Sequence, residues 1–449
     1  MEELEIREHV DLIREVFYYA QKFDGKTLVL KIDYPIVQES HFSLLIKDLA
    51  MMHQTDIQIV IVPGAKERIN EILSEYRIEA PFVKGVRISS SEAIPFIKMA
   101  AFDVANKFMT QLSAYRVNAV IGNWVRARGL GIIDGVDYQN TGRVDKINVD
   151  SIRELLKDGH IPIFPCIGWS AAGKPYNIST DEIALAVSEA LGAQKLFFVS
   201  ATPGITAELY HIPETINLSN GGRVARLNLS QTEELVRLNQ DRGGTDLHTI
   251  ELALKACKKG VERVHLVDGR IEGVILKEIF SNLGIGTMVY SNDYESIRNM
   301  RQMDISDVLH LMKPLVDKGI LIQRTDEDMQ HLYPDFVIYE VDGVIHACGA
   351  LHVFEDGQAE IAAIATNPTY NTMGVGRRIL NFLLEKAVKL QLHRVFVLTT
   401  QTLDWFEQLG FEESTLESLP DKKQKSYNYQ RKSKIFALDV KTGLTRPGV

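Results

Sequence analysis

The chain has 449 residues, of which 45% are hydrophobic and 24% charged, and its formal net charge is −9 at pH 7. These values are typical of a soluble globular protein with two or three domains. The acidic balance argues against a general nucleic-acid or anionic-membrane binder, and the longest apolar runs are too short to span a bilayer. The acidic N-terminal stretch lacks an apolar signal core, which favours a cytoplasmic location.

The three cysteines, Cys166, Cys257 and Cys348, are widely separated and show no CxxC or metal-ligand spacing. We therefore expect reduced thiols and no bound metal.

Short apolar strands alternate with helices through residues 1–288, which we assign to one domain. This alternation is typical of a mainly parallel, doubly wound α/β sheet. The expected strands are 27–32, 57–62, 119–121, 161–165, 195–199 and 263–267, and the expected helices are 7–24, 40–54, 90–114, 180–192, 247–259 and 271–282.

The apolar pattern is lost after this domain, so we place a linker at 289–298 and a smaller α+β domain at 299–449. Asp342-Gly343 between two alternating apolar segments predicts a β-hairpin. The remaining expected elements are a helix at 304–318, a strand at 358–366, a helix from 374, a strand at 394–398, a helix at 402–409 and a last strand at 435–440.

Gly374 and Gly376 stand where a buried strand turns into an amphipathic helix. The backbone N–H groups at a helix start have no intrahelical partner, and residues without Cβ let an anion approach them. A phosphate or pyrophosphate site and a plain turn are both consistent with this pattern. The apolar stripe of the helix comprises Val375, Ile379, Leu383, Ala387 and Leu390.

This order of elements resembles the GNAT N-acetyltransferases, whose signature at the glycine turn begins with Arg or Gln where this chain has Asn371. The resemblance implies that acetyl-CoA is the co-substrate. Its pantetheine arm would lie along a strand splayed from its neighbour, and its pyrophosphate at the turn. The implied cofactor-binding residues are Ala363, Ile364, Ala365, Thr366, Asn371, Thr372, Met373, Gly374, Val375, Gly376 and Arg377.

The first domain resembles the amino-acid kinase fold, in particular acetylglutamate kinase, through the segments 177–182, 202–205 and 284–287. The two modules in this order are similar to the bacterial N-acetylglutamate synthase family. Segments that carry this wider resemblance are 135–143, 398–411 and 427–434. It implies acetyl transfer to the amine of L-glutamate, the first step of arginine biosynthesis, with allosteric feedback by L-arginine.

Three phosphate-binding elements of such kinases are altered here. Asp33 and Tyr34 follow Lys31 in place of two glycines, the second glycine loop is reduced to residues 63–66, and Ala201 replaces an Asp. Because a carboxylate and a bulky ring are poor neighbours for ATP phosphates, we expect an inactive kinase domain. The alternatives are an active acetylglutamate kinase with a fused acetyltransferase domain and a non-catalytic arginine-binding protein.

The resemblance also implies an arginine site and a hexamer in which the N-terminal helix pairs subunits. Glu278 could pair a guanidinium in bidentate fashion, while carbonyls of a glycine turn accept its remaining donors. Taken singly, Tyr19 is equally consistent with a packed helix residue and His265 with a satisfied strand histidine. The implied effector residues are Tyr19, His265, Glu278, Gly284 and Gly286.

Catalytic roles follow from the same resemblance. Glu360 matches the general base and Ser433 the proposed general acid, which we expect to relay or stabilise because a hydroxyl is a weak acid. Arg324 and Arg431 match contacts to the glutamate carboxylates, and a third cation falls near Lys422 or Lys423, of which we assign Lys423. The alternatives are a solvent-facing glutamate at a strand start and an ordinary run of solvated lysines.

Overall fold

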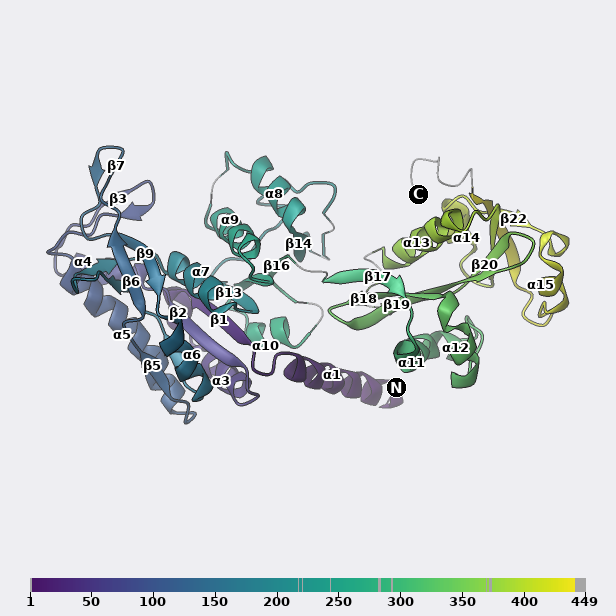
Figure 1. Cartoon of the computed structure of the whole chain (residues 1–449), viewed down its shortest axis with the longest axis horizontal. Helices are drawn as coiled ribbons and strands as arrows, with labels where there is room; N and C mark the ends of the chain where they lie inside the picture. Colours follow the sequence, from purple (N-terminus) through teal and green to yellow (C-terminus); the bar gives the residue numbers. More distant parts are fainter. Residues whose placement is uncertain are drawn as a thin grey trace. The chain divides into compact units, whose positions relative to one another are not determined.

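The computed structural model in Figure 1 describes residues 2–440 apart from 217, 220, 243, 282–283, 292–293, 369 and 371–373. The chain divides into two compact units, Met1–Asn292 and Asp293–Val449. Part of the segment expected as a linker, 289–298, lies in strands: β16 (Thr287–Tyr290) ends in it and β17 (Glu295–Asn299) begins in it. Among the described residues, no helix has the length and hydropathy needed to cross a membrane.

The first unit is built on an eight-stranded sheet in the order β14-β16-β15-β13-β1-β2-β10-β5. Its neighbouring strands run parallel, except that β16 is antiparallel to β15. The other strands of this sheet are β1 (Thr27–Ile32), β2 (Gln58–Pro63), β5 (Ala119–Ile121), β10 (Ile161–Ile163), β13 (Lys195–Ser200), β14 (Arg226–Asn228) and β15 (Arg263–Asp268).

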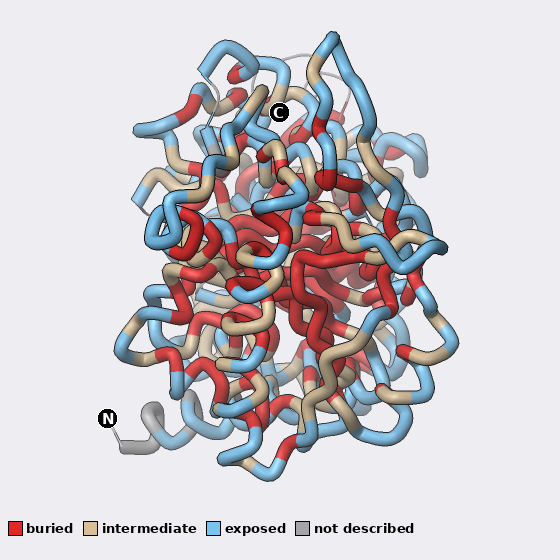
Figure 2. Tube along the Cα trace, turned by 90° about the vertical axis from the view of Figure 1, so that its left-hand side faces the viewer, coloured by how far each residue is buried: buried red, intermediate tan, exposed pale blue. Residues whose placement is uncertain are grey.

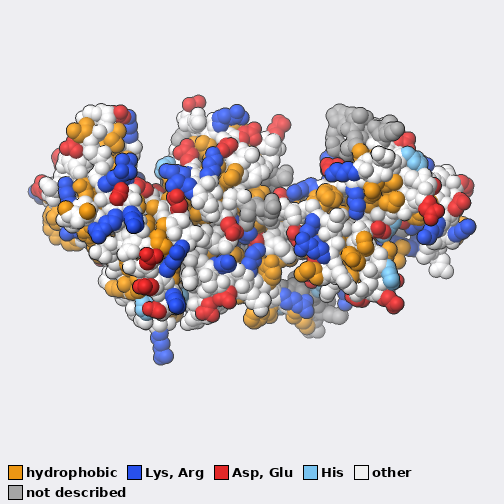
Figure 3. Space-filling view, in the orientation of Figure 1, with side chains coloured by type: hydrophobic (Ala, Val, Ile, Leu, Met, Phe, Trp, Pro, Cys, Tyr) orange, Lys and Arg blue, Asp and Glu red, His pale blue; other side chains and the backbone are white. Residues whose placement is uncertain are grey.

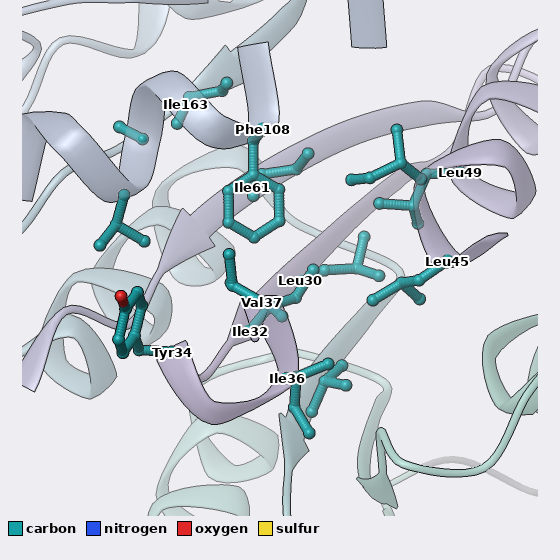
Figure 4. Close-up of a cluster of buried hydrophobic side chains, with 14 of the residues drawn as sticks. Leu30, Ile32, Tyr34, Ile36, Val37, Leu45, Leu49, Ile61, Phe108 and Ile163 are labelled. Carbon is teal, nitrogen blue, oxygen red and sulfur yellow. The ribbon is translucent and has the colours of Figure 1, made fainter. Parts of the chain in front are cut away.

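Alternate residues of the central strands enter two different cores, one on each face of the sheet. Leu30 of β1 packs in one cluster and Val29 in the other, as the two-residue period of a strand requires. Figure 4 shows Leu30 and Ile32 with Ile61 and Phe108 in the first cluster, and Figure 2 shows the buried strands inside the unit. The expected doubly wound α/β fold is therefore confirmed.

Helices cover both of these faces. The helices of the first unit are α1 (Glu2–Lys22), α2 (Tyr34–Val37), α3 (Phe42–His53), α4 (Lys66–Glu75), α5 (Ile94–Ser113), α6 (Val149–Lys157), α7 (Thr180–Leu191), α8 (Leu229–Leu238), α9 (Thr245–Lys258) and α10 (Val274–Ile279), of which α1 extends away from the sheet. A four-stranded sheet, β12-β11-β6-β9, and two hairpins complete the unit. These short strands, at 175–177, 167–169, 125–129 and 142–147, carry many polar residues and were not expected from the sequence.

The apolar stripe of α1 is exposed in the single chain. Between 38% and 65% of Val10, Ile13, Val16 and Phe17 is exposed, whereas Tyr19 is buried. The stripe is therefore available to another partner.

The second unit is a seven-stranded sheet in the order β17-β18-β19-β20-β21-β23-β22, in which only β20 and β21 form a parallel pair among the described strands. Within this unit, Figure 1 draws α13 on one side of the sheet and α11 and α12 on the other. Its further elements are β18 (Phe336–Val341), β19 (Val344–Val353), β20 (Gln358–Thr366), β21 (Arg394–Thr399), β22 (Glu412–Ser414), β23 (Lys434–Asp439), α11 (Ile305–Asp317), α12 (Asp326–Leu332), α13 (Val375–Lys389), α14 (Leu403–Gln408) and α15 (Asp421–Lys425).

Two sequence expectations in this unit have clear outcomes. Asp342 and Gly343 have φ values of 57° and 86°, as a tight hairpin turn requires. The stripe of α13 is buried from Val375 to Ala387, but Leu390 follows the end of the helix and is 50% exposed.

On the face of each unit that Figure 3 draws, basic and acidic side chains are interspersed.

Candidate functional site

The sheet of the second unit opens between β20 and β21. The parallel register pairs Gln358 with Arg394 and ends at Glu360 with Phe396, while β20 continues to Thr366. Among the described strands, residues 361–366 therefore pair only with β19. The backbone N–H and C=O groups of residues 361–365 on the β21 side can therefore bind another molecule, because a strand carries such groups along both edges.

A β-bulge lies where the two strands part. The register of β19 with β20 shifts between Cys348 and Ala350, and Ala363 has a φ of 54°. The Cys348 thiol donates to the Ala363 carbonyl at 3.5 Å, and burial raises the pKa of this thiol to about 12. Since a bulge bends its strand, this irregularity directs β20 away from β21.

The expected phosphate turn follows β20. Gly374 precedes α13 with a left-handed φ of 68°, and a Cβ on Gly376 would lie 3.7 Å from Thr366. Arg377, in the first turn of α13, is exposed, whereas Arg378 pairs with Glu295 at 3.1 Å. Asn371, Thr372 and Met373, expected to bind the pyrophosphate, lie outside the described residues.

Glu360 is buried rather than solvent-facing, with 8% of the residue exposed. Its Oε2 atom accepts a hydrogen bond from Lys423 Nζ at 2.6 Å. Lys423 belongs to the short helix α15, so residues 63 positions apart meet at the end of the paired part of β20. The lysine is therefore part of this site and not only of a solvated charge run.

Two arginines lie near this pair. The Arg324 guanidinium is 5.8 Å from the centre of the Phe336 ring, and burial lowers the pKa of Arg324 against the opposing effect of Glu360. Arg431 repels Arg324 electrostatically and donates to the carbonyls of Gly319 and Ile320 at 3.1 and 2.8 Å. Arg324 thus interacts electrostatically with Glu360, with Asp328 and with Arg431.

Ser433 follows Arg431 by two residues and lies at the end of β21. It directly precedes β23, whose first residue, Lys434, pairs with Thr399 at the end of β21. Its carbonyl accepts a hydrogen bond from the Tyr427 hydroxyl at 2.7 Å. Lys423, Arg431 and Ser433 therefore all come from one segment, residues 415–433.

The first unit carries a charged cluster at the carboxyl ends of β1 and β13, the edge at which parallel α/β sheets bind their ligands. Here Lys31 is buried and pairs with Asp33 at 2.5 Å and Asp181 at 2.9 Å. Burial by itself lowers the pKa of Lys31, but the two carboxylates hold it above its usual range. A Cβ on Gly64 would lie 2.7 Å from the Asp33 carboxylate, so that side chain occupies the space above the second loop.

A second buried polar group connects β15 and α10. His265 Nδ1 lies 2.8 Å from Glu278 Oε1, and the N–H groups of Ile285 and Gly286 donate to Glu278 Oε2 at 2.9 and 3.2 Å. Burial lowers the pKa of His265 to about 4, so the neutral ring donates from Nδ1. Burial by itself raises the pKa of Glu278, but the hydrogen bond from His265 holds it below its usual value.

The remaining expected effector residues are placed as follows. A Cβ on Gly284 would collide with the Glu278 carboxylate, so this turn requires glycine. Tyr19 stacks on Phe23, with ring centres 5.8 Å apart, and the Lys195 ammonium lies 4.4 Å from the Phe23 ring. Phe23 thus connects α1 to the strand β13.

Asp181 is a residue of the site in the first unit that sequence reasoning did not identify. It stands in the first turn of α7, within the segment 177–182 that carries the kinase resemblance. That motif was available as a signal, but its contact with Lys31 joins residues 150 positions apart.

Comparisons with known proteins agree with this two-part organisation. The amino acid kinase family matches residues 22–268, and the acetyltransferase (GNAT) family matches residues 306–411. The amino-acid acetyltransferase of Pasteurella multocida (strain Pm70) is 33% identical over 448 residues, which cover 97% of this chain and 99% of that protein. The amino-acid acetyltransferase of Salmonella typhimurium (strain LT2) is 31% identical, with 96% and 98% covered.

Solved structures give the same result. N-acetylglutamate synthase from Neisseria gonorrhoeae, complexed with coenzyme A and L-arginine, matches with a TM-score of 0.79 and 27% identity. The same protein complexed with coenzyme A and N-acetyl-glutamate matches with a TM-score of 0.59 and 28% identity. Both matches cover 96% of this chain and 99% of the other. The chain therefore belongs to the amino-acid acetyltransferase family, that of bacterial N-acetylglutamate synthase, and is an acyltransferase with an amino-acid kinase-like domain followed by a GNAT domain.

Proposed function

We propose that this enzyme transfers the acetyl group of acetyl-CoA to the amine of L-glutamate, and that L-arginine, bound in the first unit, regulates the transfer. The observation that carries the proposal is the Lys423–Glu360 pair, with Arg324 acting on Glu360 and Arg431 acting on Arg324, at the point where β20 leaves β21. A substrate with two carboxylates and one ammonium group matches three cations and one carboxylate in charge.

The acetyl donor is assigned to the opening beyond Glu360. The edge of residues 361–365 that faces away from β19 offers backbone donors and acceptors to the amide groups of a pantetheine arm. The first turn of α13, with Gly374, Gly376 and the exposed Arg377, offers N–H groups and positive charge to its phosphates. The Neisseria relative, whose structures contain coenzyme A, supports this assignment.

Within this site Glu360 accepts the proton that the substrate amine must lose before it attacks the thioester. Lys423 donates a hydrogen bond to Glu360 Oε2 and so fixes the position of this carboxylate beside the substrate amine. Arg324 and Arg431 hold the substrate carboxylates, and so fix the amine beside Glu360. Ser433, at the mouth of the opening, supplies a hydroxyl near the departing sulfur.

An active acetylglutamate kinase is the weaker proposal. Asp33 and Asp181 neutralise Lys31, and Tyr34 is buried among apolar side chains (Figure 4), where a kinase needs charge free for phosphates. We therefore propose that the first unit binds an effector instead of ATP.

The His265–Glu278 pair supports arginine as that effector. Glu278 is a buried carboxylate, and His265 Nε2 is buried with no hydrogen-bond partner within the described part of the chain. A neutral histidine offers an acceptor at that atom, which suits the donors of a guanidinium group. An effect of arginine on acetyl transfer requires coupling between two sites, whichever its sign.

Assembly is the last part of the proposal. The exposed stripe of α1, formed by Val10, Ile13, Val16 and Phe17, is the kind of surface that a second copy covers. Together with the family resemblance, it supports a hexamer that is built from dimers through this helix.

One assay tests the central proposal: thiol release from acetyl-CoA is measured across a panel of amino acids, with and without arginine. We expect turnover with L-glutamate, little with glutamine or alanine, and a shift on addition of arginine. Equal turnover of glutamine would contradict the assigned pocket. ATP consumption in the presence of N-acetylglutamate would instead favour the kinase alternative, and arginine binding without any acetyl transfer would favour a sensing protein.

A further inference from the structure

Glu360 must release the proton that it accepts before each new turnover, but the group is almost enclosed. Only 11% of its side chain is exposed, and its Oε2 atom is hydrogen-bonded to Lys423. A lysine held as an ammonium group cannot accept a further proton. A second titratable group with access to solvent is therefore needed beside Glu360.

His352 occupies such a position. It pairs directly with Glu360 in the antiparallel register of β19 and β20. Directly opposite side chains lie on the same face of a sheet, with Cβ atoms about 5 Å apart. His352 also lies edge-on to Phe336 at 6.2 Å, and Phe336 is the ring beside Arg324. The imidazole is thus on the face of the sheet that carries the proposed substrate cations.

Asp335 fixes this imidazole. His352 Nδ1 lies 2.7 Å from Asp335 Oδ2, so Nδ1–H donates to the carboxylate and Nε2 is left as the acceptor. The exposed fraction of the side chain rises from 11% at Glu360 to 17% at His352 and 41% at Asp335. The three groups therefore form a series that leads from the enclosed carboxylate to solvent.

We propose that His352, oriented by Asp335, is a proton relay that acts through Glu360. The proton leaves the protonated Glu360 carboxyl for His352 Nε2, directly or through one water molecule, and regenerates the carboxylate. The resulting imidazolium, stabilised by Asp335, then loses a proton to solvent. No oxidant or further reactant is required, because acetyl transfer to an ammonium group itself releases one proton.

The charges around His352 are of both signs. Asp335 contacts it, and Glu360 faces it across the strands. Lys423 pairs with Glu360, and Arg324 lies beside the Phe336 ring that His352 also contacts. Lys386 of α13 interacts electrostatically with Asp335.

The inference rests on the proposed function and is tested with the full-length enzyme at saturating acetyl-CoA and glutamate. His352→Gln retains a side chain that can donate to Asp335 but cannot carry a proton. We expect kcat to fall about 10- to 100-fold, with the KM for glutamate changed less than about twofold. Added imidazole should restore part of the kcat of His352→Ala. Asp335→Asn should lower kcat less and shift the pH at which the rate is half-maximal.

His331→Gln serves as the matched control, because His331 is an exposed histidine at the end of α12, in the same unit. It should retain the full kcat and pH profile. An unchanged kcat in His352→Gln would overturn the relay. A higher KM for glutamate at constant kcat in His352→Gln would also overturn it. The relay would be overturned as well if imidazole did not restore the activity of His352→Ala and Asp335→Asn behaved as the wild type. If the unmodified enzyme does not acetylate glutamate, the proposed function fails, and the relay is tested with the amine that it does acetylate.

Discussion

The two units each carry a charged cluster at the ends of their strands, and the two clusters differ in how their charges are paired. In the first, Asp33 and Asp181 neutralise Lys31, and Asp33 fills the space over Gly64. In the second, Lys423 pairs with Glu360, Arg324 interacts electrostatically with Glu360, and residues 361–365 of β20 have no pairing strand on the β21 side among the described strands. The first cluster is therefore neutralised by its own side chains, whereas the second combines basic side chains with a strand edge that can bind another molecule.

The first unit retains a different polar group, the His265–Glu278 pair. The first unit therefore has a buried carboxylate, Glu278, that is separate from the charged cluster around Lys31. This difference supports the proposals that the second unit transfers the acetyl group and that the first unit binds arginine.

The largest expected effect is that of Glu360→Gln. Loss of the base should lower kcat about 100- to 10,000-fold, because general base catalysis contributes that much. Steady-state rates at saturating substrates measure it. Glu327→Gln, an exposed residue of α12, is the control and should behave as the wild type. If Glu360→Gln remained fully active, Glu360 would not be the group that removes the proton from the substrate amine.

Arg324→Ala should have the next largest effect. A hydrogen bond to a charged group is worth about 1.5–3 kcal/mol, so the KM for glutamate should rise about 10- to 100-fold while that for acetyl-CoA changes little. Lys313→Ala, at an exposed position of α11, is the control for a lost surface charge. An unchanged KM for glutamate would remove Arg324 from the pocket.

The pH dependence of the free energy of unfolding tests the His265–Glu278 pair. Because the pKa of His265 is lowered to about 4 in the folded protein, the unfolded chain binds more protons between about pH 6.5 and 4. The free energy of unfolding should therefore fall by up to about 1.4 kcal/mol per pH unit as the pH drops through this window.

The lowered pKa of Glu278 acts in the same direction, since its contribution is lost as the pH falls through that pKa. Denaturant unfolding at several pH values, with His265→Gln for comparison, measures the effect.

In the same pair, Glu278→Ala should abolish the response of acetyl transfer to arginine. A normal response would exclude this pair as the effector site.

The smallest expected effect on catalysis is that of Lys31→Met. The variant leaves Asp33 and Asp181 without their cation, so we expect it to lower the free energy of unfolding by about 1–3 kcal/mol. Acetyl transfer per folded molecule should be unchanged, and neither protein should consume ATP. A thermal melt and an activity assay at low temperature separate the two quantities. ATP turnover that disappears in Lys31→Met would show that the first unit is an active kinase with its site around Lys31.

The sequence alone determined the two-part organisation and the main strands. Strand 27–32 is a run of apolar residues with turns on both sides, and it forms β1 with those limits. The Asp342-Gly343 turn is equally local, because positive φ at both residues specifies a tight hairpin. The polar strand β17 was instead expected to lie in a linker, because an edge strand carries charged residues and lacks the apolar pattern.

What the tertiary structure alone decided is which charges meet. Without the family resemblance, Lys423 is one of several lysines in a charged run, and His352 carried no signal at all. Strand register and α15 bring both residues to Glu360. Likewise, Asp181 and Lys31 are distant in sequence and meet only because β1 and α7 pack together. Periodicity and turn chemistry act over a few neighbouring residues, so they can be read from the sequence. An ion pair depends on the position of two side chains in space, and only the packed sheet fixes that position.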